Sequence, residues 1–133
     1  MPTQFISPPT LPPTNGWSQV VVAEAGKTIY LSGQVSVNEK GEVVGKGDMK
    51  AQAEQVFANL KAGLAAAGAT FNDVVKMNLY VVGLQPEHVP AIREVRTKYV
   101  NMQKPPASTL VGISALVVPD WLIEVEVVAV LAG

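Results

Sequence analysis

Apolar and polar positions along the chain first mark a pair of strands. β-Branched and aromatic residues dominate residues 17–24 and 28–37, a composition typical of strands. Residues 25–27 are short enough to join the two segments as a β-hairpin. The folded part of the chain is therefore expected to begin with two antiparallel strands.

Helical spacing of apolar residues predicts a helix in the next segment. Asp48 is a suitable N-cap, the helix runs to about Ala67, and Gly68 supplies the stop. The residues expected to pack inward are Ala53, Val56, Phe57, Leu60 and Leu64. The polar residues expected on the other face are Lys50, Gln52, Asn59 and Lys61.

A second helix is predicted over residues 87–100. Its inward positions are expected to be Val89, Ile92, Val95 and Tyr99. Pro90 is compatible only with the first turn of this helix. His88, the only histidine of the chain, lies at its start, where a surface or capping role is expected rather than that of a general base.

Three more strands complete the pattern. Residues 75–81 alternate between apolar and polar side chains, as a strand with one buried face does, and strands are also predicted at residues 107–116 and 122–131. The order β-β-α-β-α-β-β predicts an α+β domain with a mixed sheet and both helices on one face. Because the strands carry apolar residues on both faces, we expect an oligomer to bury the second face.

The first residues form a separate segment. Five of the ten prolines fall in the first thirteen residues, which predicts an extended arm rather than a helix or central strand. Asn15-Gly16 ends this arm with a turn signal. The expected organisation is a proline-rich arm over residues 1–16 and a single domain over residues 17–133.

The composition excludes several classes of function. Of 133 residues, 48% are hydrophobic and 16% charged, and the net charge of −1 offers no surface for nucleic acid or an anionic membrane. Without cysteine the chain has no disulfide, thiol nucleophile or thiolate metal site. No secretory signal pattern begins the chain, and no apolar run reaches the about 20 residues that span a bilayer. We expect a soluble, cytoplasmic protein.

Few residues of the chain are candidates for a catalytic or ligand-binding role. Gly33 lies within a predicted strand, where glycine usually marks a bulge or a close approach of the backbone, so Ser32-Gly33 is a candidate ligand-binding segment. Glu124 and Glu126 share one strand face, either a solvated edge or a cleft in which a carboxylate orients water or moves a proton. Trp17 either walls such a cleft or packs in a core or an interface. The glycine-rich loops match neither a P-loop nor a dinucleotide-binding fingerprint.

Five segments, in this order and spacing, resemble the Rid family, the reactive intermediate deaminases of YjgF type, which include endoribonuclease L-PSP-like proteins. They are Tyr30-Leu31-Ser32-Gly33-Gln34, Ala67-Gly68 after an alanine-rich helix, Val74-Val75-Lys76, Pro105-Pro106-Ala107-Ser108-Thr109 and Ile123-Glu124-Val125-Glu126. The resemblance covers almost the whole chain, residues 15–132.

This resemblance implies a chorismate-mutase-like protomer that assembles as a homotrimer. The sheets would face a central barrel, the helices would lie outside, and small molecules would bind in clefts between neighbouring subunits. Active members hydrolyse reactive enamines and imines derived from amino acids, such as 2-aminoacrylate and 2-iminobutanoate, to 2-keto acids and ammonia. They use no cofactor and no metal.

The resemblance also implies a site. Glu124 matches the family's water-positioning glutamate, and Ser32 and Gly33 match the strand that lines the cleft. Backbone groups near Ser32-Gly33 and Leu110 are expected to bind polar atoms of the ligand. Trp17 stands in place of the family's usual tyrosine.

Ser108 is the main departure from the family pattern. In active members an arginine follows the Pro-Ala pair and clamps the substrate carboxylate, whereas a serine hydroxyl offers one neutral donor. Losing the clamp would cost about 2–5 kcal/mol of binding, as for other desolvated charge pairs. Arg93 or Arg96 is a possible replacement from the second helix, although both are more simply explained as solvated helix charges. The family's asparagine on this helix is missing, with Arg93 nearby.

Two classes of function follow. The first is a Rid-type hydrolase or deaminase acting on a small imine, enamine or related metabolite, with the usual 2-imino acid activity in doubt because of Ser108. The alternative is a non-catalytic trimer that binds a metabolite or a protein partner. A ribonuclease role ranks third, since the chain lacks a basic stripe.

Overall fold

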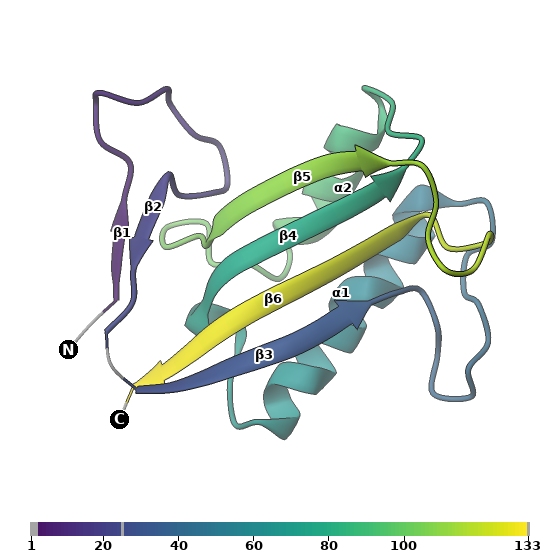
Figure 1. Ribbon diagram of the computed structural model, residues 1–133, viewed down its shortest axis with the longest axis horizontal. Coiled ribbons are helices and arrows are strands. Elements are labelled where there is room, and N and C mark those ends of the chain that lie inside the picture. Colours follow the sequence, from purple (N-terminus) through teal and green to yellow (C-terminus); the bar gives the residue numbers. More distant parts are fainter. Residues whose placement is uncertain (1–2, 25, 133) are drawn as a thin grey trace.

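The main sheet has four strands in the order β3-β6-β4-β5, and both helices cover one of its faces (Figure 1). In this computed structural model, which describes residues 3–24 and 26–132, the strands are β3 (Gly26–Gln34), β4 (Val74–Val82), β5 (Ala107–Ile113) and β6 (Ile123–Ala132). Neighbouring strands are antiparallel except β4 and β5, which are parallel. The α+β class expected from the sequence, with a mixed sheet and two helices, is confirmed.

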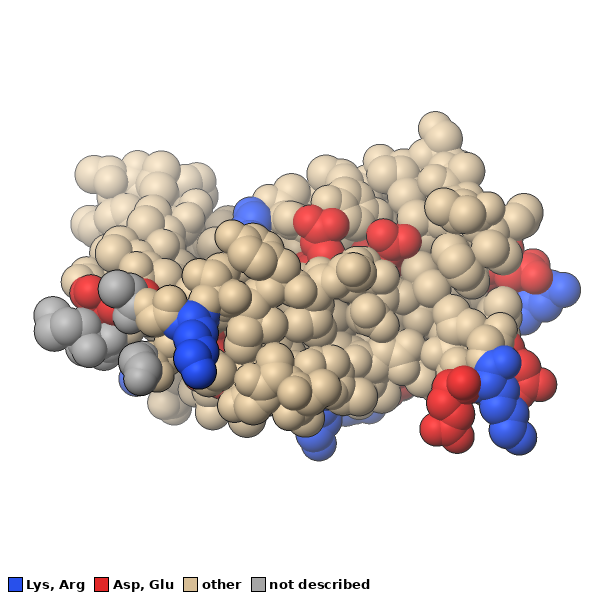
Figure 2. Space-filling view, turned by 60° about the horizontal axis from the view of Figure 1, so that its bottom comes forward, with Lys and Arg blue, Asp and Glu red and all other residues tan. Residues whose placement is uncertain are grey.

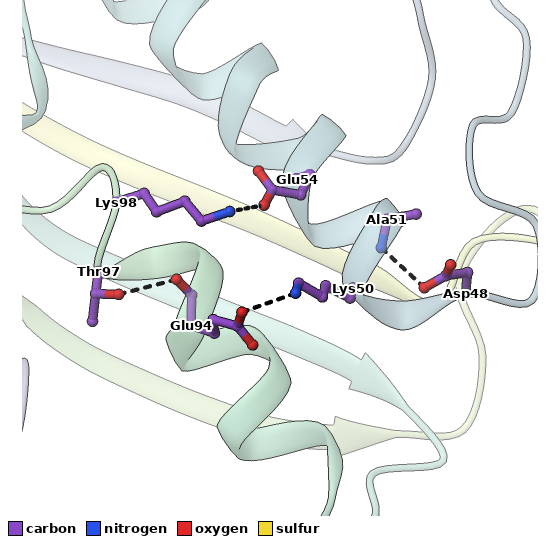
Figure 3. Close-up of polar contacts among 7 residues, drawn as sticks. All are labelled: Asp48, Lys50, Ala51, Glu54, Glu94, Thr97 and Lys98. Atoms are coloured by element: carbon purple, nitrogen blue, oxygen red, sulfur yellow. Dashed lines mark hydrogen bonds and ion pairs between the residues drawn. The ribbon is translucent and has the colours of Figure 1, made fainter.

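Helix α1 (Met49–Ala66) begins and ends where its capping residues predict. Oδ1 of Asp48 accepts a hydrogen bond from the backbone N–H of Ala51 at 3.1 Å (Figure 3), and Gly68 adopts a left-handed φ of +78° after the last turn. The five apolar residues predicted to face inward are all buried. Local signals in the sequence were sufficient here because a cap and a glycine act within one turn of the helix.

Gln52 departs from the prediction for α1. It was expected on the solvated face, yet its side chain is fully buried. Its Nε2 donates to the carbonyl oxygens of Gly45 and Asp120, and its Oε1 accepts from the N–H of Leu122 at 2.9 Å. The amide thus ties the helix to the loops before α1 and before β6, and these long-range partners explain its burial.

Helix α2 (His88–Arg96) is shorter than predicted. Pro90 lies in its first turn, as expected, and Ile92 and Val95 are buried, whereas Val89 is only partly buried. Tyr99 lies beyond the end of the helix, where its ring still packs at 5.6 Å from that of Phe57.

The two helices are joined at the surface by ion pairs that Figure 3 shows. Lys50 Nζ lies 2.8 Å from Glu94 Oε1, and Lys98 pairs with Glu54. The pairing with Lys50 lowers the pKa of Glu94, and the hydrogen bond to Glu54 raises the pKa of Lys98. Such exposed pairs contribute little stability, because water screens the charges.

The predicted hairpin is wrong. β2 (Val20–Val22) pairs with β1 (Gln4–Ile6), which lies in the proline-rich arm, and β3 pairs with β6. Figure 1 shows the small β1-β2 sheet beside the main sheet, near the start of β5. The composition of a valine-rich strand does not specify its partner, and here the partner comes from the arm.

Strand β4 follows the expected alternation except at its start. Met77, Leu79 and Val81 face the helices and are fully buried, as predicted. An irregularity in the pairing with β6 between Val74 and Lys76 shifts the pattern, so Val74 is buried in place of Val75. The opposite face, here called the open face, carries no helix.

Candidate active site

One pocket lies between the edge strand β5 and helix α2. It is lined by Trp17, Val89, Arg93, Arg96, Ser108 and Leu110 and has a volume of about 250 Å³. We call it the arginine pocket. Three residues predicted as ligand-binding, Trp17, Ser108 and Leu110, therefore lie together in one chain.

The register of β5 places two of these side chains on the helix side of the sheet. Ser108 is the neighbour of Met77 in the parallel pair with β4, and Leu110 is the neighbour of Leu79. Because neighbouring residues of paired strands share a face, Ser108 and Leu110 point to the side that α2 covers.

Trp17 reaches the pocket because the chain around Ser18 is tied to the start of β5. Ser18 forms an isolated parallel bridge with Ala107, and its N–H donates to the carbonyl of Pro106 at 3.0 Å. Its hydroxyl donates to the carbonyl of Pro105 at 2.6 Å. Sequence reasoning missed Ser18, since its partners lie 87 residues away in the chain.

Gly33 and Glu124 form a second predicted pair, on the open face. The pairing of β3 with β6 steps from Leu31 opposite Val127 to Gln34 opposite Val125, so Ser32-Gly33 contains one extra residue. A Cβ atom built on Gly33 would overlap the carboxylate of Glu124. The prediction that Gly33 marks a bulge or a close approach is confirmed, because it does both.

Other polar groups gather around this carboxylate. Glu126 lies on the same face, and its Oε2 accepts a hydrogen bond from Asn78 Nδ2 at 3.1 Å. Partial burial, followed by the charge of Glu126, raises the pKa of Glu124. The pKa of Tyr80 is also raised, first by desolvation and then by the nearby Glu126 and Glu124 charges. A carboxylate that holds its proton more tightly is suited to proton transfer nearer neutral pH.

Within one chain the two groups of predicted residues lie on opposite faces of the sheet. Glu124 is the neighbour of Tyr80 on β4, whereas Ser108 is the neighbour of Met77, and these two β4 positions have opposite orientations. Ser32 is exposed in the bulge beside Gly33. A single chain thus does not bring Glu124 to the arginine pocket.

No metal centre is found in the described part of the chain, where no group of three or more His, Cys, Asp or Glu side chains could hold an ion. His88 has a local partner instead: its Nδ1 accepts from the N–H of Gln85 at 2.9 Å, just before α2. This bond lies in the turn before α2, whose N-cap is Glu87 without a side-chain capping bond, so a helix-capping role for His88 stays a prediction.

This architecture is shared with known proteins. A family model described as Endoribonuclease L-PSP matches residues 9–131. The solved structure of YyfB from Yersinia pestis, described as a protein of unknown function of the conserved Rid protein family, has a TM-score of 0.90 and 39% identity, and covers 98% of this chain and 100% of that chain. The chain belongs to the Rid family.

Curated relatives of this Rid protein carry names of deaminases. A 2-iminobutanoate/2-iminopropanoate deaminase of Dermatophagoides farinae is 36% identical over 86% of this chain and 87% of that protein. The 3-aminoacrylate deaminase RutC of Acinetobacter baylyi is 33% identical over 97% of this chain and 98% of its own length. Among the described residues of the Rid chain, no helix is long and apolar enough to cross a membrane.

Proposed function

We propose that this Rid protein hydrolyses a small reactive imine or enamine in a cleft between subunits. The observation that carries the proposal is the Glu124 carboxylate on the open face, held against the Gly33 bulge with its pKa raised. The names of the deaminase relatives support the same chemistry. No cofactor is required for this reaction.

Glu124 is assigned the role of positioning water and moving protons. Water adds to the carbon of the C=N bond, and Glu124 takes a proton from that water as the C–O bond forms. The nitrogen receives protons and leaves as ammonia, while the carbon becomes the carbonyl of the product. Backbone groups near Ser32-Gly33 and Leu110 are assigned to bind polar atoms of the substrate.

A second copy of the chain is needed to complete the proposed cleft. Because Glu124 and the arginine pocket occupy opposite faces of one sheet, only packing between chains would bring them to one ligand. The open face supports such packing: Tyr30 is 78% exposed there, and its neighbour on β6 is Val128. Figure 2 shows broad areas without charge between scattered charged side chains. We propose a homotrimer.

Ser108 sets the expected substrate preference. If it replaces the family's arginine, the chain lacks that clamp for the carboxylate of 2-iminobutanoate, and the natural substrate either has no carboxylate at that position or is held by other groups. The competing proposal is a trimer that binds a metabolite or partner without turnover. A location in the cytoplasm stays a prediction.

The test is hydrolysis of freshly generated 2-iminobutanoate by the purified protein. We expect Glu124→Ala to abolish any acceleration and Ser108→Arg to increase kcat/KM by about tenfold or more through a regained charge-assisted clamp. Glu87→Ala, on the exposed residue before α2, is the matched control and should retain full activity. If Glu124→Ala loses nothing and Ser108→Arg gains nothing, imine hydrolysis is not its function. Ligand binding without turnover over a panel of imines would favour the non-catalytic alternative.

A further inference from the structure

Both arginines of the chain lie in the arginine pocket. The sequence has eight lysines and only these two arginines, Arg93 and Arg96. They occur three residues apart on α2, so they share one face of the helix, and both line the pocket with Ser108 and Trp17. The planar guanidinium groups are thus concentrated at one place in the fold.

Neither guanidinium has a counter-charge within residues 3–24 and 26–132. Arg96 is only 7% exposed, and the Nε atoms of Arg93 and Arg96 are both buried without a hydrogen-bond partner. All ion pairs found in this part of the chain involve lysines, including that of Glu94, which lies between the two arginines in sequence and pairs with Lys50.

The backbone before Trp17 fits closely around Arg96. Gly16 has a left-handed φ of +80°, and a Cβ built there would lie 3.5 Å from Nη2 of Arg96. The same Ser18 contacts that position Trp17 also fix this turn against the start of β5. The Arg96 side chain is thus packed beside this turn and largely removed from solvent.

Two neighbouring like charges, Arg96 buried and Arg93 half-buried, each with a buried Nε that has no hydrogen-bond partner, are unfavourable unless an anion joins them. Burial, followed by the charge of Arg93, lowers the pKa of Arg96, although a guanidinium remains protonated at neutral pH. Leaving such charges unpaired carries a large desolvation cost, which a bound carboxylate would offset through paired N–H···O bonds. A single carboxylate would compensate one of the two charges.

We propose that the arginine pocket binds a small dicarboxylate, with one carboxylate on Arg96 and the other on Arg93. The apolar walls from Trp17, Val89 and Leu110 would enclose its carbon chain, and the volume of about 250 Å³ limits it to a small organic acid. The substrate class rests on the proposed function: the reactive molecule would be the imine or enamine of a dicarboxylic 2-oxo acid, which water converts to that acid and ammonia. Arg93 and Arg96 would be its specificity-determining residues.

The experiment compares two acids of equal length by titration calorimetry at low ionic strength. 2-Oxoglutarate and 2-oxopentanoate differ only in whether the far end is a carboxylate or a methyl group. We expect 2-oxoglutarate to bind wild-type protein about tenfold more tightly or better, as for a charge-assisted pair. Arg93→Gln and Arg96→Gln should each remove most of this difference. Lys98→Gln, which removes the same charge from an exposed position after α2, is the matched control and should preserve it.

If Arg96→Gln impairs folding, melting temperatures of a second variant, Arg96→Met, provide the test instead. Arg96→Met removes an unpaired buried charge, so the melting temperature without ligand should rise, while the increase in melting temperature caused by 2-oxoglutarate should be lost. Equal binding of the two acids, or a preference unchanged in Arg93→Gln, would overturn the inference. Arginine-dependent binding without imine hydrolysis overturns only the proposed function. Hydrolysis of 2-iminobutanoate without arginine-dependent binding overturns only the inference.

Discussion

Gly33 leaves the space that the carboxylate of Glu124 occupies. A Cβ atom at residue 33 would overlap the Oε2, Cδ and Cγ atoms of Glu124, and the bulge at Ser32-Gly33 brings the two strands into this arrangement. The position of the proposed catalytic group therefore depends on a residue with no side chain. This dependence makes the contact open to direct test.

Gly33→Ala should impair activity more than stability. The methyl group forces the Glu124 carboxylate to move, and a small displacement of a catalytic group can lower kcat by about 10- to 100-fold. Overpacking of this kind should lower the free energy of unfolding by about 1–3 kcal/mol. Steady-state kinetics with the imine and urea unfolding measure the two effects separately.

The double variant Gly33→Ala/Glu124→Ala is the control for this interpretation. Shortening residue 124 removes the atoms that the new methyl group meets, so the stability losses of the single variants should not add. Additive losses would mean that the alanine at position 33 acts through the backbone and not through Glu124.

Glu124→Gln should change the pH dependence of stability. The folded-state pKa of Glu124 is raised, so the folded protein binds this proton more tightly than the unfolded chain, and wild-type stability falls as pH rises through the raised pKa. Glutamine cannot ionise and escapes this loss. The variant should gain relative to wild type at pH values above the ordinary carboxyl pKa of about 4.3 and show no such gain below it. Melting temperatures of both proteins over this pH range measure the difference in stability. A variant less stable than wild type at neutral pH would contradict the prediction.

The helices were the part of the fold most accessible from sequence. Asp48 and Gly68 mark α1 because capping and left-handed φ act locally, and its apolar stripe follows one period. Strand pairing was less accessible, since β2 joins the arm strand β1 instead of β3. Gln52 shows the same dependence on partners distant in the sequence. An amide in a predicted helix is assigned to the surface unless its long-range backbone partners are known.

The candidate site likewise has features that local sequence predicts and features that depend on long-range packing. The glycine in a strand predicted a bulge at Gly33, but the residue opposite it depends on the register with β6. Ser108 and Leu110 were predicted as site residues from the family resemblance, and Trp17 from both the resemblance and its aromatic character, whereas Ser18, which ties the chain beside Trp17 to β5, carried no signal in the sequence. That Arg93 and Arg96 share one pocket with them depends on how α2 lies on the sheet.

Gln52→Leu should strongly destabilise the protein. Leucine has a side-chain volume similar to that of glutamine but cannot form its hydrogen bonds. The Leu122 N–H and the Gly45 and Asp120 carbonyls therefore lose their side-chain partner. Buried groups left unpaired in this way should lower the free energy of unfolding by about 2–4 kcal/mol. Lys61→Leu, on the exposed face of the same helix, should change it by less than about 0.5 kcal/mol. Urea unfolding measures both, and similar small effects would contradict the structural role of Gln52.

Tyr30→Glu should disrupt the proposed trimer. The side chain lies on the open face beside Val128, and a charge there would have to be buried or repelled on assembly. Light scattering at micromolar concentration should give a trimer for wild type and a smaller species for the variant. Val117→Glu is the control, because Val117 is 89% exposed in the loop between β5 and β6 and should leave the mass unchanged. A monomeric wild-type protein would exclude the cleft between subunits.

Ser18→Ala should loosen the position of Trp17 in the arginine pocket without removing any residue that lines the pocket. Ser18 is only 4% exposed, and loss of its hydroxyl leaves the Pro105 carbonyl without that donor, which should cost about 1–3 kcal/mol of stability. The backbone bond from Ser18 to Pro106 is retained, so the chain should still fold while Trp17 becomes more mobile. In a Trp121→Phe background, Trp17 fluorescence should show increased quenching by acrylamide. Ser114→Ala, at an exposed position after β5, should have no effect on fluorescence, and equal behaviour of the two variants would show that Ser18 does not position Trp17.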